Sequence, residues 1–274
     1  MSKLLLIKLG GSLITDKGKD FTAKPHVISR LAKEIGASQK IFNGQIIIAH
    51  GSGSFGHSAA AKYQIKNGLT SHRSFVGLPL VADAAIQINR IVIKNFLAAK
   101  LPVVSFAPAS FIVAHNQHPK KVMANPLFLA LEKGFLPILY GDIIFDQRKG
   151  FCIFSSETIL GILAKEATSR FDEIRIIYCG DTDGVCNLDE KTIPVITPKS
   201  FRNLQRYVTG SKKTDVTGGM LHKVEEGLNL AKKGINTLIL NGNRPYELKK
   251  AILGQKTNGT LISQDLKHIC IHTH

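Results

Sequence analysis

The sequence predicts an α/β fold in which helices cover both faces of a mainly parallel sheet. Short apolar runs bounded by turn residues alternate with longer segments whose apolar residues recur at helical spacing. The runs are apolar throughout rather than alternating, which is typical of strands buried on both faces. Alternation of such strands with helices indicates a parallel sheet. With 274 residues, 44% of them hydrophobic, the chain is large enough for one such unit.

The elements follow in order along the chain. The predicted strands are residues 3–9, 45–50, 101–106, 135–141, 174–179, 236–242 and 259–262. The predicted helices are residues 24–36, 80–100, 125–134, 156–167 and 219–234. The first helix has Pro25 near its start and Gly36 at its end, as helix termini prefer.

Two segments depart from this alternation. Residues 142–154 predict a β-hairpin with Gly150 near its turn. Residues 191–219 are polar and contain Pro and Gly, which predicts a mobile loop near a functional site. We find no fixed-period repeat and no clear linker, so we expect one continuous unit with two halves.

Composition argues against several classes of protein. No uninterrupted apolar run approaches the ~20 residues that a membrane span requires, and Lys8 interrupts the apolar start of the chain. We therefore expect a cytoplasmic protein that does not enter a membrane. The four cysteines lie far apart without a C-x-x-C motif, so we expect free thiols and neither disulfides nor a zinc site.

The net charge of +16 favours anionic partners: nucleic acid, an anionic membrane surface or phosphorylated small molecules. The lysines are spread along the chain, Trp is absent, and aromatic residues are not interleaved with basic ones as in stacking platforms for nucleic acid. We therefore expect no nucleic-acid partner, and a solvated basic surface explains most of the charge.

The stretch HGSGSFGH at residues 50–57 matches two phosphate-binding spacings at once. A dinucleotide site needs an acidic residue about 20 positions later, which is missing here. A P-loop needs a lysine where His57 stands, and histidine is too short and too weakly charged to replace it. There remains an anion site made by backbone N–H groups and a helix that begins near Ser58. A tight strand-to-helix turn explains the glycines equally well.

A second glycine-rich element, KLGGS, follows the first predicted strand. Lys8 lies within that apolar strand, and a lysine there requires a negative partner. A snorkelling side chain at a sheet edge is the alternative. Lys17 follows a few residues later.

Two further elements lie in the second half. Gly218 and Gly219 precede a helix that carries Lys223 one turn in, although Thr217 could simply cap that helix. Asp181 and Asp183 follow a strand, where they could form a turn or contact a ribose or a metal-bound nucleotide.

Taken together and in this order, these elements resemble the amino acid kinase superfamily, and within it the kinases of isopentenyl phosphate. The resemblance covers nearly the whole chain. The segments that carry it are KLGGSLITDK (8–17), HGSGSFGH (50–57), YGDIIFD (140–146), DTDGV (181–185), DVTGGM (215–220) with Leu221, His222 and Lys223, NGNRP (241–245) and GTLI (259–262).

The resemblance implies an open three-layer αβα sandwich, the amino acid kinase fold, as a single domain over residues 1–274. It implies that residues 1–165 hold the acceptor and residues 166–274 hold ATP. The implied reaction is ATP- and Mg²⁺-dependent phosphorylation of isopentenyl phosphate to isopentenyl diphosphate, in isoprenoid biosynthesis. The resemblance also suggests a homodimer.

The same resemblance implies roles for individual residues. Lys8, Lys17 and Lys223 would contact the transferred phosphate, His57 would bind the acceptor's phosphate, and Glu157 would orient the lysines. The remaining acceptor residues would be Gly10, Gly11, Gly51, Ser52, Gly53, Asp142 and, along the alkyl chain, Leu78 and Val81. The nucleotide residues would be Lys8, Asp181, Asp183, Gly184, Thr217, Gly218, Gly219 and Lys223. No protein ligand to a metal is predicted.

The chain departs from the family pattern at two places. Ser52 replaces the middle glycine of the histidine loop, and SSET at residues 155–158 stands where the family has S-G-D-D. Glu157 keeps a carboxylate there, one methylene longer than aspartate.

Two other functions are compatible with the residues. One is a kinase of another alkyl phosphate or of a phosphonate such as fosfomycin. The other is a non-catalytic nucleic-acid-binding or regulatory protein on the kinase fold. Retention of Lys8, Lys17, His57, Asp142 and Lys223 together favours catalysis.

Overall fold

The computed structural model describes residues 1–56, 63, 68–187, 189–202 and 219–265. Its centre is a sheet with strand order β10-β12-β11-β9-β1-β2-β6-β3. The strands are β1 (Lys3–Leu9), β2 (Gln45–His50), β3 (Val103–Ser105), β6 (Leu136–Tyr140), β9 (Glu173–Gly180), β10 (Val195–Ile196), β11 (Asn236–Asn241) and β12 (Gly259–Ile262). Neighbouring strands are parallel except β11 and β12, so the predicted mainly parallel sheet is confirmed.

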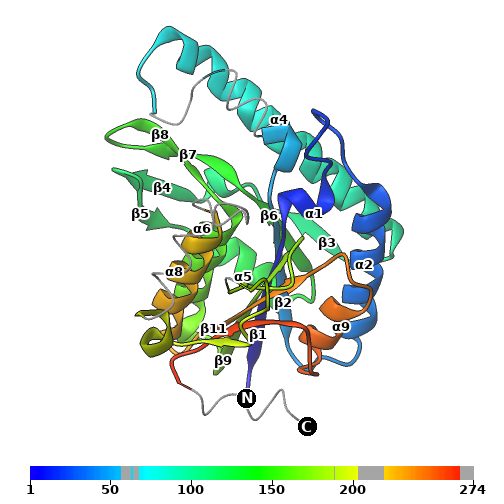
Figure 1. The fold of residues 1–274 in the computed structure, drawn as a ribbon. Helices are drawn as coiled ribbons and strands as arrows, with labels where there is room; N and C mark the ends of the chain where they lie inside the picture. Colours follow the sequence, from blue (N-terminus) through cyan, green and yellow to red (C-terminus); the bar gives the residue numbers. More distant parts are fainter. Residues whose placement is uncertain (57–62, 64–67, 188, 203–218, 266–274) are drawn as a thin grey trace.

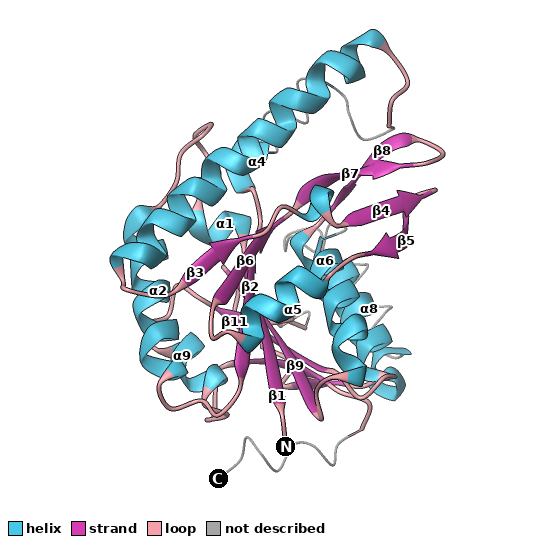
Figure 2. Ribbon diagram, turned by 180° about the vertical axis from the view of Figure 1, so that it is seen from behind, coloured by secondary structure: helices cyan, strands magenta, loops and turns pink. Residues whose placement is uncertain are grey.

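Helices cover both faces of this sheet (Figures 1 and 2). One face carries α1 (Gly11–Ile14), α2 (Pro25–Gln39), α4 (His72–Ala98) and α9 (Glu247–Ile252), and the other carries α5 (Asn125–Glu132), α6 (Ser156–Glu166) and α8 (Gly219–Ala231). Leu5 and Ile7 of β1 pack into the first core, and Leu4 and Leu6 into the second. This explains why the strand is apolar on both sides.

A second sheet, ordered β5-β4-β7-β8, lies beside the first half of α4 (Figures 1 and 2). Its strands are β4 (Ile112–His115), β5 (His118–Val122), β7 (Asp142–Asp146) and β8 (Gly150–Phe154). The predicted hairpin is therefore confirmed, and Gly150 has the positive φ of 78° that its turn requires. The β4–β5 pair is not predicted, because HPKKV has no apolar run to mark it.

Several predicted boundaries differ from those in the structure. Helix α2 continues beyond Gly36 to Gln39. A Cβ on Gly36 would lie 3.0 Å from Leu101 Cδ2, so this glycine serves close packing rather than helix termination. Strand β3 pairs only over Val103–Ser105, which is shorter than the apolar run that predicted it.

Helix α4 begins at His72 rather than at residue 80. Ser71 Oγ accepts from Ser74 N at 3.2 Å, and Ser74 Oγ accepts from Ser71 N at 3.0 Å, which forms a capping box. Pro79 lies inside the helix without ending it. The predicted start at residue 80 is therefore too late, because the cap at Ser71 and the packing of the helix outweigh the one hydrogen bond lost at Pro79.

Among the described helices, α4 alone is long and apolar enough to cross a membrane by length and composition, with a mean hydropathy of 1.5 over the best window. Its buried residues, including Ile88, Val92 and Phe96, pack into the core beside α2. That packing is typical of a core helix.

Three further predictions concern segments that the structure describes only in part. Much of the predicted loop at 191–219 lies outside them. Residues 53–56 are already helical, so helical structure begins before the predicted start near Ser58. Cys152, Cys179 and Cys186 are free thiols, as predicted, and Cys270 is not described.

Candidate active site

A cavity with a volume of about 940 Å³ lies at the carboxyl ends of β1, β2 and β6. Ligand sites of open α/β sheets occur at this edge. The described residues that line it are Lys8, Gly11, Ser12, Lys17, Gly51, Ser52, Gly53, Ser54, Gly56, Val81, Ala85, Gln117, Gly141, Asp142, Ile143, Ile153, Phe154, Ser155, Ser156, Glu157 and Lys223. The cavity thus brings together residues from both halves of the sequence.

The two glycine-rich loops touch each other at the floor of this cavity. A Cβ on Gly11 would lie 2.5 Å from Gly53 N, and one on Gly51 would lie 2.8 Å from Gly11 N. Gly53 also has a positive φ of 52°. These glycines are therefore required by the contact between the loops, whether or not a phosphate also approaches them.

Thr15 holds the two loops in this arrangement. Its hydroxyl donates to Gly11 O at 2.7 Å and accepts from Ser54 N at 3.0 Å. Thr15 is fully buried. The sequence prediction did not include it, although a hydroxyl residue four positions after Gly11 was the available signal.

Lys8 and Glu157 form a buried ion pair with 2.7 Å between Nζ and Oε1. Lys8 comes from β1, and Glu157 lies in the first turn of α6, whose N-terminus is capped by Ser155 Oγ accepting from Thr158 N. The negative partner that a lysine in an apolar strand requires is therefore this carboxylate.

The charge of Glu157 is maintained by its lysines. Burial alone would raise its pKa, but the charge and hydrogen bond of Lys8, together with the charge of Lys223, lower the pKa from 4.5 to about 2. The carboxylate is ionised at neutral pH and can orient both lysines toward the cavity.

Asp142 lines the same cavity, but its pKa is shifted in the opposite direction from that of Glu157. Its burial raises its pKa from 3.8 to about 6, although hydrogen bonds from Ala109 N and Ile143 N act in the other direction. The distances are 3.1 Å from Ala109 N to Oδ2 and 2.8 Å from Ile143 N to Oδ1.

An apolar wall lies next to Asp142. Val81 and Ala85 are one turn apart on α4, and Ile143 and Ile153 face each other across the β7–β8 ladder. Val81, which the resemblance assigns to the alkyl chain, lines this cavity. Leu78 does not line the cavity but packs against the core. The i, i+4 spacing of Val81 and Ala85 was a signal that the sequence prediction overlooked.

His50 anchors the loop that carries the glycines. Its ring is completely buried, with Nε2 3.2 Å from Asn89 Oδ1 and Nδ1 3.1 Å from the oxygen of Gly51. Burial lowers its pKa, although both hydrogen bonds oppose the shift. A neutral His50 has one ring N–H and so donates to only one of these two oxygens, and its ring lies between the glycine loop and Asn89 of α4.

The acidic residues predicted to bind nucleotide are engaged with cations. Asp181 Oδ2 lies 3.1 Å from Lys17 Nζ. Burial raises the pKa of Asp181, but the hydrogen bond and charge of Lys17 outweigh it and the pKa is lowered. Asp183 accepts from Arg244 Nε at 2.7 Å and from Asn241 Nδ2 at 2.9 Å. Neither aspartate lines the large cavity.

Two glycines near these aspartates, Gly184 and Gly10, make close contacts within the fold. Gly184 has φ of 103°, and a Cβ there would lie 2.5 Å from Thr260 Oγ1. Gly10 donates its N–H to Cys179 O at 2.8 Å. Gly219 is the exposed first residue of α8. The predicted residues His57, Thr217 and Gly218 lie outside the described residues.

No group of three or more His, Cys, Asp or Glu residues that could hold a metal ion occurs among the residues that the structure describes. The cavity instead combines Lys8, Lys17 and Lys223 with residues of the glycine loops at one end and an apolar wall at the other. Such an arrangement can bind a phosphorylated molecule with an apolar tail.

Fold and site together define an α/β protein with a cationic cavity for phosphorylated small molecules. The chain belongs to the amino acid kinase family, whose sequence model matches residues 3–241. This agrees with the predicted αβα fold.

Individual relatives are similar over nearly the whole chain. The isopentenyl phosphate kinase of Methanothermobacter thermautotrophicus is 32% identical, with 95% of this chain and 99% of that protein covered. That of Methanocaldococcus jannaschii is 30% identical over 92% and 96%. A solved structure described as an X-ray structure of isopentenyl phosphate kinase aligns with a TM-score of 0.79 at 29% identity, over 94% of this chain and 100% of the other.

Proposed function

We propose that this protein transfers the γ-phosphoryl group of ATP to isopentenyl phosphate and forms isopentenyl diphosphate. The observation that carries the proposal is the shape of its cavity, in which lysines and glycine-loop backbone lie at one end and Val81 and Ala85 at the other. A phosphate with a short branched alkyl tail matches both ends. The similarity to isopentenyl phosphate kinases supports the same substrate.

The acceptor's chemistry explains why the cavity holds lysines rather than a strong base. The second pKa of an alkyl phosphate is about 6, so its oxygen is already mostly ionised at neutral pH. In the reaction this oxygen forms a bond to the γ-phosphorus while the bond to the β–γ bridging oxygen breaks and ADP leaves. The main barrier is repulsion between anions, which positioned cations and N–H dipoles reduce.

Within this scheme Lys8 and Lys223 neutralise the transferred group, and Glu157 holds them in place. Lys17 lines the cavity and pairs with Asp181, so it lies between the acceptor side and the strand end of β9. His57 binds the acceptor's phosphate. We assign the acceptor to residues 1–165 and ATP to residues 166–274.

Mg²⁺ usually keeps several waters and is held by one or two carboxylates together with substrate phosphates. We therefore propose that it enters the site on the phosphates of ATP and supplies charge neutralisation there. We also propose a cytoplasmic location and a homodimer, which rest on the sequence and on the family resemblance.

The test is ATP- and Mg²⁺-dependent phosphorylation of a panel: isopentenyl phosphate, longer prenyl phosphates, simple alkyl phosphates and fosfomycin. The His57→Ala variant is measured beside the unchanged protein. We expect turnover of isopentenyl phosphate that collapses in the variant.

Other outcomes separate the alternatives. Turnover confined to another acceptor would retain the kinase chemistry and replace the substrate. No turnover of any acceptor, together with salt-sensitive binding of nucleic acid, would favour the non-catalytic alternative.

A further inference from the structure

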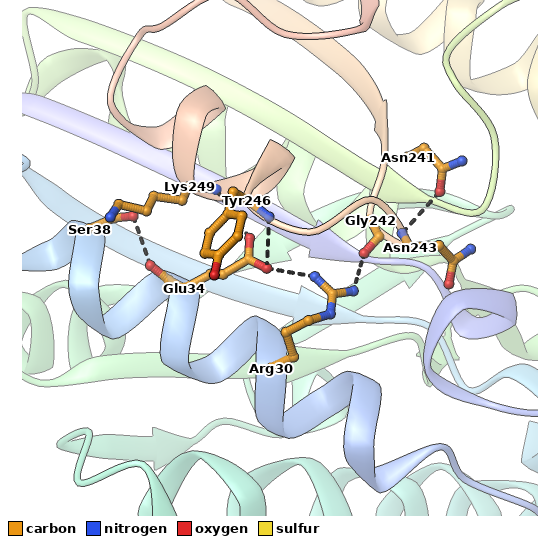
Figure 3. A network of polar contacts seen from close by, with 8 residues as sticks. All are labelled: Arg30, Glu34, Ser38, Asn241, Gly242, Asn243, Tyr246 and Lys249. Atoms are coloured by element: carbon orange, nitrogen blue, oxygen red, sulfur yellow. Dashed lines mark hydrogen bonds and ion pairs between the residues drawn. The ribbon is translucent and has the colours of Figure 1, made fainter.

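A partly buried polar network joins helix α2 to the loop between β11 and α9 (Figure 3). Glu34 of α2 is only 5% exposed, and its Oε1 accepts from Arg30 Nη1 at 2.6 Å. Arg30 Nη2 also donates to the carbonyl oxygen of Gly242. The two side chains therefore hold a segment that is more than 200 residues away in the sequence.

Glu34 also fixes the start of α9. Its Oε1 accepts from Tyr246 N at 3.2 Å, and its Oε2 lies 3.4 Å from Lys249 N. Tyr246 is the N-cap of α9, has a φ of 66° and provides no side-chain cap of its own. A carboxylate from another helix therefore satisfies N–H groups that the helix start leaves open.

The held loop, residues 241–246, packs directly on the end of β9. Gly242 N donates to Gly180 O at 2.8 Å, and a Cβ on Gly242 would lie 2.4 Å from Cys179 Sγ. The loop can approach this closely only because residue 242 is glycine. Burial raises the pKa of the Cys179 thiol to about 12, and the charge of Glu34 contributes to the increase.

The same loop holds the aspartate loop that follows β9. Asn241 Nδ2 and Arg244 Nε both donate to Asp183 Oδ1. Arg244 adds a second contact to Oδ2, which makes the pair bidentate. Asp181, in the same aspartate loop, pairs with Lys17 at the cavity. A continuous series of contacts thus leads from α2 through loop 241–246 to the cavity.

We propose that Arg30 and Glu34 are positioning residues for the nucleotide: from a helix of the acceptor half, they fix loop 241–246 and, through it, the aspartate loop of the nucleotide half. The inference rests on the proposed function, since that function assigns ATP to the second half. Neither residue lines the cavity. Their effect therefore passes through the loops that they hold.

The test compares Arg30→Met with Lys33→Met. Lys33 is an exposed residue on the same helix, so its variant controls for loss of a positive charge from α2. Binding of a non-hydrolysable ATP analogue with Mg²⁺, and separately of isopentenyl phosphate, is measured by calorimetry. We expect the Arg30 variant to bind the nucleotide about tenfold more weakly, as loss of charged hydrogen bonds predicts, and the acceptor within twofold of normal. Lys33→Met should change neither.

A double variant tests whether Arg30 acts on nucleotide binding through loop 241–246. Because Arg30 and Arg244 act through one loop, Arg30→Met/Arg244→Met should weaken nucleotide binding no more than about twofold beyond the stronger single variant. A double variant whose loss of nucleotide affinity equals the product of the two single losses would show that Arg30 and Arg244 do not act through the same loop. Arg30→Lys, which keeps the charge, should recover part of the affinity and serves if the Met variant does not fold.

Kinetics separate positioning from general destabilisation. We expect a raised KM for ATP with little change in kcat or in KM for isopentenyl phosphate. Equal weakening of both ligands, or unchanged nucleotide affinity, would overturn this inference alone. Absence of nucleotide binding by the unchanged protein would overturn the proposed function with it.

Discussion

At the two ends of the cavity, the pKa values of two buried carboxyl groups are shifted in opposite directions. At the cationic end, Lys8 and Lys223 lower the pKa of Glu157 to about 2 despite its burial. At the apolar end, burial raises the pKa of Asp142 to about 6, and only backbone N–H groups oppose the shift. Both residues lie in one cavity. Their difference shows that nearby cations, rather than burial alone, decide the direction in which the pKa of each carboxyl group moves.

This contrast matches the two parts of the proposed acceptor. A phosphate is stabilised where fixed positive charge is concentrated, and an alkyl tail is stabilised where few charged groups remain. The cavity therefore orients the acceptor by its chemistry as well as by its shape.

The largest effect should come from removing the central cation. Lys8→Met leaves Glu157 buried without its closest partner and removes a cation from the phosphate site. Loss of one partner of a buried pair costs about 3–5 kcal/mol of stability. Loss of one transition-state contact lowers kcat by about 10²–10³-fold. Thermal unfolding and steady-state kinetics measure the two effects.

Lys3→Met is the matched control on the same strand. Lys3 pairs with Glu173 at 3.1 Å, but the two side chains are 40% and 36% exposed, against 9% and 14% for Lys8 and Glu157. Because solvent screens an exposed pair, Lys3→Met should leave kcat unchanged and cost less than about 1 kcal/mol. Similar losses in both variants would show that burial does not distinguish the pairs.

Glu157→Gln should act next most strongly, and its effect on stability should depend on pH. The folded pKa of about 2 lies below the ordinary 4.5, so the charged carboxylate contributes stability that is fully present above pH 4.5 and is lost as pH falls toward 2. The difference in melting temperature between the unchanged protein and the variant should therefore shrink between pH 5 and about pH 2.5. A difference that stays constant over this range would contradict the assigned ion pair.

At the apolar end, Val81→Ala should alter selectivity more than catalysis. Removing apolar contacts from a hydrophobic pocket changes discrimination by about tenfold or more. We expect the ratio of kcat/KM for isopentenyl phosphate to that for methyl phosphate to fall by about that factor. Leu78→Ala is the control on the same helix, and it should keep the ratio because Leu78 does not line the cavity.

The smallest effect should be the pH-dependent stability of Asp142→Asn. The raised folded pKa favours the protonated form, so the contribution of Asp142 is greatest below pH 3.8 and declines as pH rises to about 6. The variant should therefore gain stability relative to the unchanged protein between pH 4 and pH 7. Melting temperatures across this range test the sign, and a relative loss would contradict burial as the dominant cause.

Local patterns in the sequence were sufficient for most strands of the large sheet and for the choice of candidate cationic residues. The runs at residues 3–9 and 45–50 became β1 and β2 without change, because strands buried on both faces must be apolar throughout. Lys8 was identifiable for the same reason, since a charge inside such a strand requires a partner. The β4–β5 pair, whose second strand HPKKV is exposed at most positions, had no comparable signal.

Tertiary contacts set the features that depend on distant segments. The contact of Gly11 with Gly53 and the capping of α9 by Glu34 both follow from how distant segments meet in space. Asp142 and Glu157 are both carboxylic acids in the sequence, and their opposite pKa shifts arise because folding places only one of them beside lysines. Residue type supplies the possible chemistry, and proximity in the fold determines which of it is used.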